Sequence, residues 1–543
     1  MGVETLQQHE ALIQSLMDPE RWPAGGGRRQ RIDTHISTVV LAGHRAYKIK
    51  KPLDLGFLDF VTLDNRHKAC EEELRLNRRL APDVYLAVCA ITGSIENPRI
   101  AGGDCVSVGP SHAPPDDDAS PGHHPPGHHP APVIDWAVVM RRFDPDAILS
   151  DPGVEPDTRL IDELAARVAA FHAAAAVCDL QAAFGSPDVV AEPMKQNFIQ
   201  IRVPDGADAA LLARLKHWTL RALDELTPIL AQRKANGFVR ECHGDLHLGN
   251  IALIDGQPVV FDAIEFNAGL RWIDTISDAA FLTMDLHHRG LSELAYRFLD
   301  GYLQHSGDYA GTRVIQLYQV YRAMVRAKIA AIRAGQDLPR SEKADVAAEL
   351  SSYLQTAAEL SEPRHGAVVI THGVSGSGKS TVAARLPGVL PAIRIRSDIE
   401  RKRLLNIDPT EDATGHGAYT ASLTEDTYSR LAESAAAVAR SGYIALVDAT
   451  FLKTEYRARF AALAQAAEVA FAIIDCDAPP DLLRARIRER RKASDNVSDA
   501  DLQVLERQLQ QRDRLTPAER GLSVTVTPDL ALDVDRLLRL LQS

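Results

Sequence analysis

The segment Gly373-Val374-Ser375-Gly376-Ser377-Gly378-Lys379-Ser380-Thr381 decides the fold of the C-terminal third of the chain. It follows the apolar run 367–372, which predicts a short buried strand, and it leads into residues 381–386, which predict the start of a helix. Its glycines allow the backbone to curl, so that N–H groups and the helix N-terminus point at an anion. This order of strand, glycine loop and helix predicts a site for the phosphates of a nucleoside triphosphate.

Two side chains of this loop have separate expected roles. We expect Lys379 to reach the β- and γ-phosphates and the Ser380 hydroxyl to ligate Mg²⁺, which makes ATP and Mg²⁺ the predicted cofactors. The alternative is a glycine-rich turn that contains a lysine by chance. The strand before the loop and the helix after it argue against that alternative.

Beyond residue 366 the sequence alternates between short apolar runs and helical patterns. The runs that predict strands are 368–371, 392–395, 444–447, 469–474 and 522–526. Strands that alternate with helices are typical of a parallel sheet covered on both faces. We therefore predict a three-layer α/β domain with a parallel sheet over residues 366–543, which contains the phosphate loop.

The acceptor side of this domain is predicted at the end of its second strand. Asp398 could take the proton of an acceptor hydroxyl, and Arg401, one helical turn later, could bind an acceptor phosphate. The alternative is an Asp that caps a helix, with Arg401 on the surface. The pair resembles the D-x-x-R of 5′-hydroxyl polynucleotide kinases and zeta-toxin-like kinases, which implies a small-molecule or nucleic-acid-end acceptor.

Two further features complete the predicted C-terminal site. Asp448 ends the predicted strand 444–447, the position of a carboxylate that supports Mg²⁺. Arg486 and Arg490 lie at i and i+4 and would share one helix face, as do the lid arginines of small kinases. The neighbours Arg484, Arg488 and Arg491 leave open which arginine reaches the phosphate, and a solvated basic face is the alternative.

A second phosphate-handling pattern lies about 130 residues upstream. His243-Gly244-Asp245 is followed by Asn250, and Asp262 ends the apolar run 258–261. A kinase catalytic loop has this order: an Asp accepts the hydroxyl proton, and an Asn and a second Asp hold metal ions. The H-G-D form resembles the aminoglycoside phosphotransferase and choline kinase group. The resemblance implies that Asp245 is the base and that Asn250 and Asp262 bind Mg²⁺.

Such a kinase also needs a lysine on the ATP phosphates and a glutamate that positions it. Lys48 fits the end of the expected strand, and Lys50 competes with it because alternate strand residues share a face. Among Glu71, Glu72 and Glu73 we favour Glu73, which lies on the apolar side of the predicted helix 65–80. Glu265 is a further candidate contact to metal or substrate.

The predicted fold class is an α+β two-lobed kinase-like N-terminal domain followed by the α/β P-loop kinase domain. Residues 1–335 would form the first domain, and the Pro-, Gly- and His-rich stretch 102–132 would be a disordered insertion. Residues 336–365 would form a polar helical connector.

Composition excludes several classes of protein. The net charge of −12 gives no global basic field that would attract nucleic acid, although it does not exclude a local basic groove. Six scattered cysteines without C-x-x-C argue against a disulfide framework or a zinc site and fit a reducing compartment. The N-terminal residues lack the pattern of a signal peptide, and no apolar run is long enough to span a bilayer. We expect a cytoplasmic protein without a membrane partner.

Taken together, the two patterns predict a fusion of two ATP-dependent phosphotransferases. The chain resembles bacterial proteins in which an aminoglycoside phosphotransferase-like domain is joined to a P-loop domain. Small-molecule acceptors are expected for the first domain, and small molecules or a nucleic-acid end for the second. The alternative from another class is a regulatory protein with a kinase-like sensor and an ATPase switch, but such a switch needs neither Asp245 nor Asp398 as an acceptor base.

Overall fold

The structure is a computed structural model. It describes residues 2–18, 21–22, 29–56, 58–100, 131–203, 206–336, 339–408, 420–490 and 502–542, without the side chains of Arg340 and Arg490. The chain forms two compact units. The first contains Met1–Glu155, Ala176–Cys178 and Val239–Ile273, and the second contains Pro156–Ala175, Asp179–Phe238 and Asp274–Ser543.

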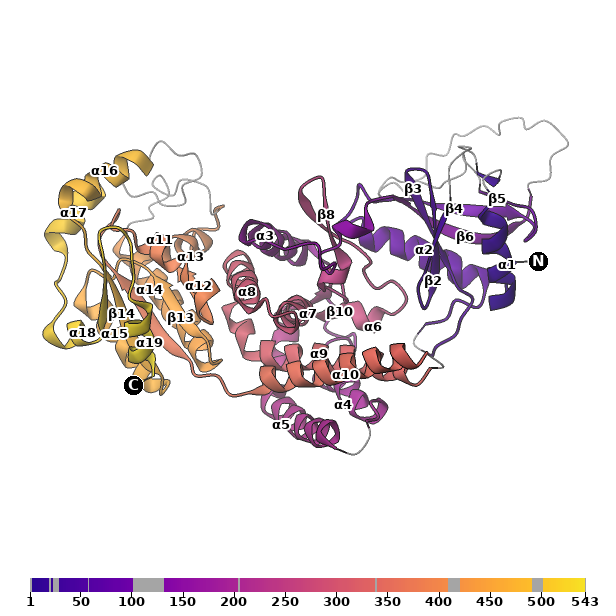
Figure 1. The fold of residues 1–543 in the computed structure, drawn as a ribbon. Helices are drawn as coiled ribbons and strands as arrows, with labels where there is room; N and C mark the ends of the chain where they lie inside the picture. Colours follow the sequence, from indigo (N-terminus) through magenta and orange to yellow (C-terminus); the bar gives the residue numbers. More distant parts are fainter. Residues whose placement is uncertain are drawn as a thin grey trace. The chain divides into compact units, whose positions relative to one another are not determined.

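The first unit is built on a six-stranded sheet with the order β1-β2-β3-β6-β4-β5, in which neighbouring strands are antiparallel (Figure 1). Its strands are β1 (Gln30–Asp33), β2 (Ser37–Ala42), β3 (Arg45–Lys50), β4 (Tyr85–Gly93), β5 (Pro98–Ile100) and β6 (Val133–Arg141). The helices α1 (Leu6–Leu16) and α2 (Leu63–Asn77) belong to the same unit. The predicted hairpin is present as β2 and β3, and the predicted helix 65–80 is present as α2.

The segment that carries the H-G-D pattern also belongs to the first unit. Its elements are β7 (Val239–Glu241), η3 (Leu248–Asn250), β8 (Ile251–Ile254), β9 (Gln257–Val260), α6 (Ala268–Arg271) and β10 (Trp272–Asp274). Strands β8 and β9 form an antiparallel hairpin, and Asp262 lies two residues after it. The lysine strand β3, the glutamate helix α2 and the Asp245 loop are thus parts of one compact unit.

The second unit contains the helical part of the chain. Its helices before the parallel sheet are α3 (Thr158–Ala174), α4 (Pro187–Gln200), α5 (Ala207–Ala235), α7 (Thr275–His288), α8 (Ser292–Ser306), η4 (Tyr309–Gly311), α9 (Thr312–Ala334) and α10 (Arg340–Ser361). Helix α10 is the predicted connector. Its Leu350, Tyr353 and Leu354 pack in one apolar core with residues of α7 and α9. The predicted domain ranges divide these elements differently from the two compact units, and they stay a prediction.

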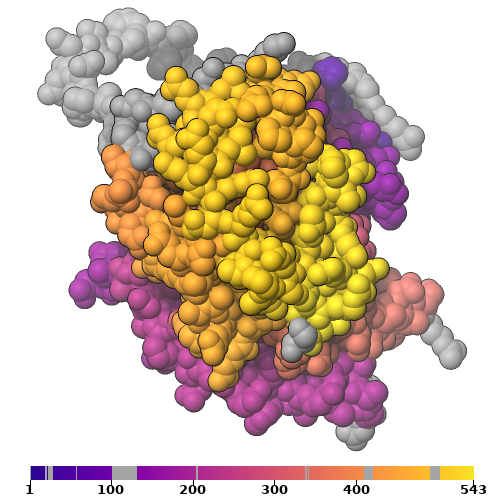
Figure 2. All heavy atoms as spheres, turned by 90° about the vertical axis from the view of Figure 1, so that its left-hand side faces the viewer, coloured from indigo at the N-terminus to yellow at the C-terminus, as the bar shows by residue number. Residues whose placement is uncertain are grey.

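The rest of the second unit is a five-stranded parallel sheet with the order β12-β13-β11-β14-β15. The strands are β11 (Ala367–His372), β12 (Ala392–Arg396), β13 (Ile444–Asp448), β14 (Ala470–Cys476) and β15 (Ser523–Val526). The helices are α11 (Lys379–Ala383), α12 (Leu386–Val389), α13 (Ser397–Leu404), α14 (Ala421–Arg440), α15 (Thr454–Ala466), α16 (Pro480–Arg490), α17 (Leu502–Gln511), α18 (Pro517–Gly521) and α19 (Val534–Leu541). This confirms the predicted α/β fold. On the face shown in Figure 2, yellow C-terminal residues lie beside the orange residues of this part.

Helix α8 lies against the edge strand β12 within the second unit. The Asp300 carboxylate accepts the Arg394 backbone N–H at 2.5 Å, and Gln304 accepts from the Arg394 guanidinium at 3.1 Å. An edge strand otherwise leaves its backbone N–H groups unpaired. Burial raises the pKa of Asp300 to about 6, although Arg394 opposes that rise. Asp300 therefore covers part of the edge that leads into Asp398.

The sequence also led to expectations about the insertion, the cysteines and membrane-spanning helices. The insertion 102–132 lies almost wholly outside the described residues. Cys70, Cys178, Cys242 and Cys476 are free and buried, whereas Cys89 is disulfide-bonded; the cysteine spacing argued against a disulfide framework, and one bonded cysteine does not form a framework. Among the described helices, none combines the length and the apolar character that a membrane crossing requires.

Candidate active sites

The Asp245 loop of the first unit is shaped by Gly244 and His243. Gly244 has φ +89°, and a Cβ at this position would lie 2.7 Å from the Leu270 carbonyl oxygen, so only glycine fits. The His243 Nε2 donates to the Phe261 carbonyl at 2.9 Å, and its Nδ1 accepts the Asp245 N–H at 3.3 Å. These bonds fix one tautomer of the ring and tie the loop to the strand end before Asp262.

The Asp245 carboxylate is held from two sides. The Asn250 amide nitrogen donates to the Asp245 carbonyl at 2.9 Å and to its Oδ2 at 3.0 Å. His247 Nε2 lies 3.3 Å from the same oxygen. The Asp245 side chain keeps 37% exposure, which leaves the carboxylate open to an acceptor molecule. The structure thus brings the predicted base and the predicted metal ligand Asn250 into direct contact.

Both candidate lysines reach Glu73. Lys48 Nζ lies 2.9 Å from Glu73 Oε1 and 2.5 Å from Asp262 Oδ1, whereas Lys50 contacts Glu73 and Glu265. Burial favours the neutral amine, but the Asp262 and Glu73 carboxylates raise the pKa of Lys48 well above its ordinary value. Lys48 joins the predicted metal ligand Asp262, and Lys50 is fully buried behind it. The geometry therefore separates the two lysines, although their roles stay predictions.

Glu265, a candidate contact to metal or substrate, is paired with a lysine in this structure, and its role stays a prediction. Its side chain is 3% exposed and paired with Lys50. Burial and the neighbouring Glu73 raise the pKa of Glu265 above its ordinary value, against the effect of Lys50. This carboxylate serves as a buried partner of Lys50.

Two polar residues near Asp262 are absent from the sequence-based prediction. Asp262 has φ +65°, an uncommon conformation for a residue with a side chain. Its backbone N–H donates to the Tyr85 hydroxyl at 3.2 Å, and the next N–H, of Ala263, donates to Asn77 Oδ1 at 2.8 Å. No local motif marks Tyr85 or Asn77, because each acts across about 180 residues of sequence.

The phosphate loop of the second unit follows β11 and enters α11. Gly373, Gly376 and Gly378 have φ of +143°, +81° and +94°. A Cβ on Gly373 would lie 2.2 Å from the Cys476 carbonyl oxygen. Lys379 Nζ donates to the Val374 carbonyl at 2.9 Å, and the Ser375 N–H donates to Gln508 Oε1 at 2.7 Å. Ser380 and Thr381 are exposed in the first turn of α11.

The acceptor-side residues lie at the ends of β12 and β13. Asp398 is paired with Arg396 at 2.7 Å, and Arg396 is the register neighbour of Asp448. Helix α13 begins at Ser397 and its N-cap is Arg396, so Asp398 lies in the first turn and is not the cap. Burial opposes ionisation, but Arg396 lowers the pKa of Asp398 below its ordinary value. Arg401 is half-buried, one turn further along α13.

Both sites contain oxygen groups that fit Mg²⁺. Asp448 Oδ2 is buried and has no hydrogen-bond partner, and burial together with the nearby Asp398 raises the pKa of Asp448. The exposed Ser380 hydroxyl belongs to the same loop-and-strand arrangement. In the first unit, Asn250 and Asp262 offer amide and carboxylate oxygens. Mg²⁺ prefers such hard oxygen ligands, so both sets fit the ion.

One lid arginine lies at the phosphate loop. Arg486 donates to the Gly376 carbonyl at 3.4 Å and to the Pro528 carbonyl at 2.8 Å. Arg484 pairs with Glu506, and Arg488 is exposed. The side chain of Arg490 and all of Arg491 lie outside the described residues. Among the described candidates, Arg486 is therefore the arginine that contacts the loop.

Comparisons with known proteins found one family model and several solved structures that are similar to parts of the chain. Residues 368–515 match the family described as AAA domain. The solved choline/ethanolamine kinase family protein from Mesorhizobium loti is 13% identical, with a TM-score of 0.33, over 65% of this chain and 99% of its own. A solved sugar kinase from Janibacter is 22% identical, with a TM-score of 0.26, over 33% of this chain and 95% of its own.

Two mycobacterial proteins are similar over most of their length. The uncharacterized protein Rv2004c of Mycobacterium tuberculosis and the uncharacterized protein Mb2027c of Mycobacterium bovis are each 30% identical to this chain over 465 residues. The match covers 84% of this chain and 85% of each relative. The chain therefore belongs to the same family as these two proteins.

Proposed function

We propose that the chain is a bifunctional ATP-dependent phosphotransferase that uses Mg²⁺ at both sites. The first unit would transfer the γ-phosphate of ATP to a hydroxyl group of a small molecule. The second unit would transfer it to a small molecule or to a nucleic-acid end. We place both activities in the cytoplasm. One observation carries the proposal: each unit holds an acceptor-side carboxylate, Asp245 or Asp398, within hydrogen-bonded contact of another polar side chain of its site.

In the first unit, the acceptor oxygen would attack the γ-phosphorus while the bond from that phosphorus to the β–γ bridging oxygen breaks. ADP leaves, and the hydroxyl proton passes to the Asp245 carboxylate. A carboxylate is a weak base, so it acts by orienting the hydroxyl and taking its proton late in the reaction. Asn250 and His247 keep the carboxylate oriented. Lys48 stays protonated beside Asp262 and Glu73, which provides a cation for the α- and β-phosphates.

In the second unit, Asp398 would play the part of Asp245, and Lys379 with the loop N–H groups would bind the phosphates. Arg486, which already contacts the loop, would neutralise charge on the transferring group. When bound, Mg²⁺ would neutralise phosphate charge and align the phosphates; Asn250 and Asp262 would hold it in the first unit, Ser380 and Asp448 in the second.

The test is a transfer assay on the full chain with γ-³²P-labelled ATP, offered to libraries of metabolites and of 5′-hydroxyl oligonucleotides. We expect at least one labelled acceptor that disappears with Asp245→Asn and another that disappears with Asp398→Asn. Release of inorganic phosphate without any labelled acceptor, unchanged in both variants, would contradict the proposal and favour an ATP-driven switch.

A further inference from the structure

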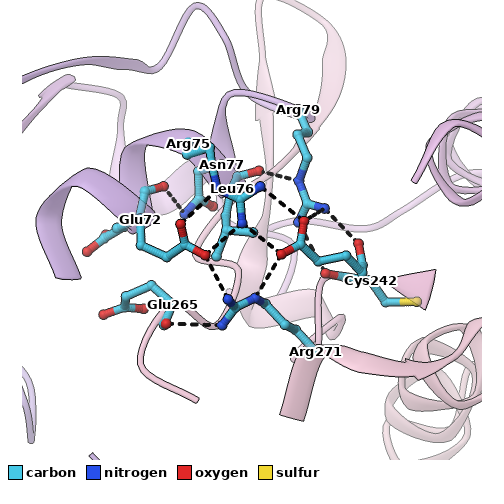
Figure 3. Close-up of polar contacts among 10 residues, drawn as sticks. Glu72, Arg75, Leu76, Asn77, Arg79, Cys242, Glu265 and Arg271 are labelled. Carbon is cyan, nitrogen blue, oxygen red and sulfur yellow. Dashed lines mark hydrogen bonds and ion pairs between the residues drawn. The ribbon is translucent and has the colours of Figure 1, made fainter. Parts of the chain in front are cut away.

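A network of five charged side chains joins helix α2 to the chain segments that flank both carboxylates of the first site (Figure 3). Its members are Glu72, Arg75, Arg79, Glu241 and Arg271. All five belong to the first unit. The first three come from α2 and the turn after it, and the other two come from β7 and α6, which are about 160 to 200 residues away in sequence.

Arg271 lies at the centre of the network. Its Nη2 lies 2.7 Å from Glu72 Oε1, its Nε lies 3.2 Å from Glu241 Oε1, and its Nη1 donates to the Glu265 carbonyl at 3.1 Å. Figure 3 shows its guanidinium pointing toward Glu72 and the Glu265 carbonyl. One planar fork thus connects the helix, the strand before the Asp245 loop and the segment after Asp262. A lysine has three donors on one nitrogen and no such planar fork, so it cannot match this spread of partners.

Arg75 and Arg79 add a second connection to the strand before the Asp245 loop. Arg75 meets both oxygens of Glu241, at 2.7 and 3.1 Å. Arg79 donates to the Glu241 carbonyl at 2.6 Å and to the Cys242 carbonyl at 3.1 Å. Cys242 directly precedes His243. The end of α2 is therefore attached to the first residues of the Asp245 loop.

The network is largely shielded from water at its centre. The side chains of Glu241 and Arg271 are 8% and 9% exposed. Burial would raise the pKa of Glu241, but Arg75, Arg79 and Arg271 lower it below its ordinary value, so the carboxylate is charged at neutral pH. Partly buried, charge-assisted pairs with fixed fork geometry are stronger than exposed pairs. Removing one member leaves buried charges without partners.

The position of Glu73 links this network to ATP. Glu72 and Glu73 are adjacent on α2, so their side chains leave the helix about 100° apart. Glu72 faces Arg271, while Glu73 faces Lys48 and Lys50. Asn77, one turn later, donates to the Glu73 carbonyl and accepts the Ala263 N–H next to Asp262. The rotation and position of α2 therefore determine whether Glu73 meets Lys48.

We propose that Arg271 is a positioning residue of the first site. Through Glu72 and Glu241 it holds α2 where Glu73 and Lys48 are in contact, so the ATP side of the site is assembled before ATP binds. This inference rests on the proposed function of the first unit as an ATP-binding kinase. It separates this unit from kinases in which a mobile glutamate helix controls activity.

The experiment measures the affinity of Mg²⁺–ATP for the full chain by calorimetry in a Lys379→Ala background, which removes the lysine of the second site. Arg271→Gln and Arg271→Lys are compared with the control Arg141→Gln, which breaks the exposed pair of Arg141 with Asp255 in the same unit. We expect Arg271→Gln to weaken binding about tenfold or more, as losses of supporting residues around a site do, and Arg271→Lys to restore part of it. The control should stay within about twofold.

A thermal melt of each variant shows whether it is folded, and Arg271→Lys decides the question if Arg271→Gln does not fold. Folded Arg271 variants that bind ATP like their parent would overturn the positioning role while leaving the proposed kinase function intact. A folded Lys379→Ala parent that binds no ATP would instead refute the ATP site of the first unit, and the positioning role with it.

Discussion

In the first site, buried lysines and carboxylates from distant segments form ion pairs with one another, whereas the second site is formed around a loop with three glycines at positive φ. Lys48 is paired with Asp262 and Glu73, and Lys50 with Glu73 and Glu265. In the second site, Ser377 Oγ and Asp448 Oδ2 are buried without a hydrogen-bond partner; Glu73 Oε1 of the first site makes no hydrogen bond either, but it lies 2.9 Å from Lys48 Nζ. A buried polar atom without a partner costs free energy that a ligand can recover.

The difference shows two ways of preparing a site for phosphate. The first site contains charged side chains from distant segments, so on the proposed function ATP would exchange partners with groups that are already paired. The second site depends on backbone shape, because three glycines at positive φ form its loop, and on the proposed function the ligand would supply the missing partners. Substitutions that change charge should therefore affect the first site most, and substitutions that change backbone shape should affect the second.

The largest expected effect separates the chemistry of the two sites. Asp245→Asn and Asp398→Asn keep the shape of each carboxylate and remove the proton acceptor. Each should lower kcat at its own site by about 10²- to 10⁴-fold with little change in ATP affinity. Turnover at each site is measured with its own labelled acceptor. If one variant slows both transfers equally, the two sites are not separate.

The next effect tests the role of backbone shape in the second site. Gly373→Ala places a Cβ about 2 Å from a carbonyl oxygen in a conformation that residues other than glycine rarely adopt. We expect a cost of about 3 kcal/mol or more in the free energy of unfolding of the loop region, and loss of ATP binding at this site. Hydrogen exchange measures the stability of the loop, and calorimetry measures ATP binding.

The matched control is Gly388→Ala in α12, where an added Cβ meets nothing within 4 Å. It should be neutral or slightly stabilising, because alanine favours helix. Equal losses in the two variants would show that the close approach at Gly373 is unimportant.

A smaller effect concerns the edge strand that leads into Asp398. The folded pKa of Asp300 is about 6 against an ordinary 3.8, so the folded state binds its proton more tightly than the unfolded state does. This contribution to stability is fully present below pH 3.8 and is lost as pH rises through about 6. A pKa difference of about two units corresponds to about 3 kcal/mol in the free energy of unfolding. Asp300→Asn should remove this pH dependence, which thermal melts at pH 4 to 8 can follow. If the melting temperatures of the natural chain and of the Asp300→Asn variant change in parallel with pH, the raised pKa of Asp300 is contradicted.

The parallel sheet and the loop that carries Asp245 and Asn250 could be predicted because short sequence patterns encode them, whereas the contact between the two side chains appears only in the structure. The strand, glycine loop and helix of the phosphate site are neighbours in sequence. Asn250 likewise follows Asp245 by only five positions. Arg271, Tyr85 and Asn77 could not be found in this way, because their partners are distant in sequence. The choice between Lys48 and Lys50 stayed open for a related reason. Both lysines share one strand face and both reach Glu73, and they differ in their second partner, which is Asp262 for Lys48 and Glu265 for Lys50.

The packing of helix α10 was missed in the sequence for a different reason. Its polar composition predicted a connector, yet Val346, Leu350, Tyr353, Leu354 and Ala357 recur at helical spacing and are buried in the helical part of the second unit. Average polarity hides a narrow apolar stripe, because the opposite face of a helix carries the charges. The spacing of the apolar residues was the available signal.

The central claim is that one chain holds two separate ATP sites, one in each unit. The most direct measurement is the number of Mg²⁺–ATP molecules bound per chain by calorimetry. We predict two for the natural chain, one for Lys48→Ala, one for Lys379→Ala and none for the double variant. A single ATP per natural chain, or the loss of both on changing either lysine, would contradict the claim.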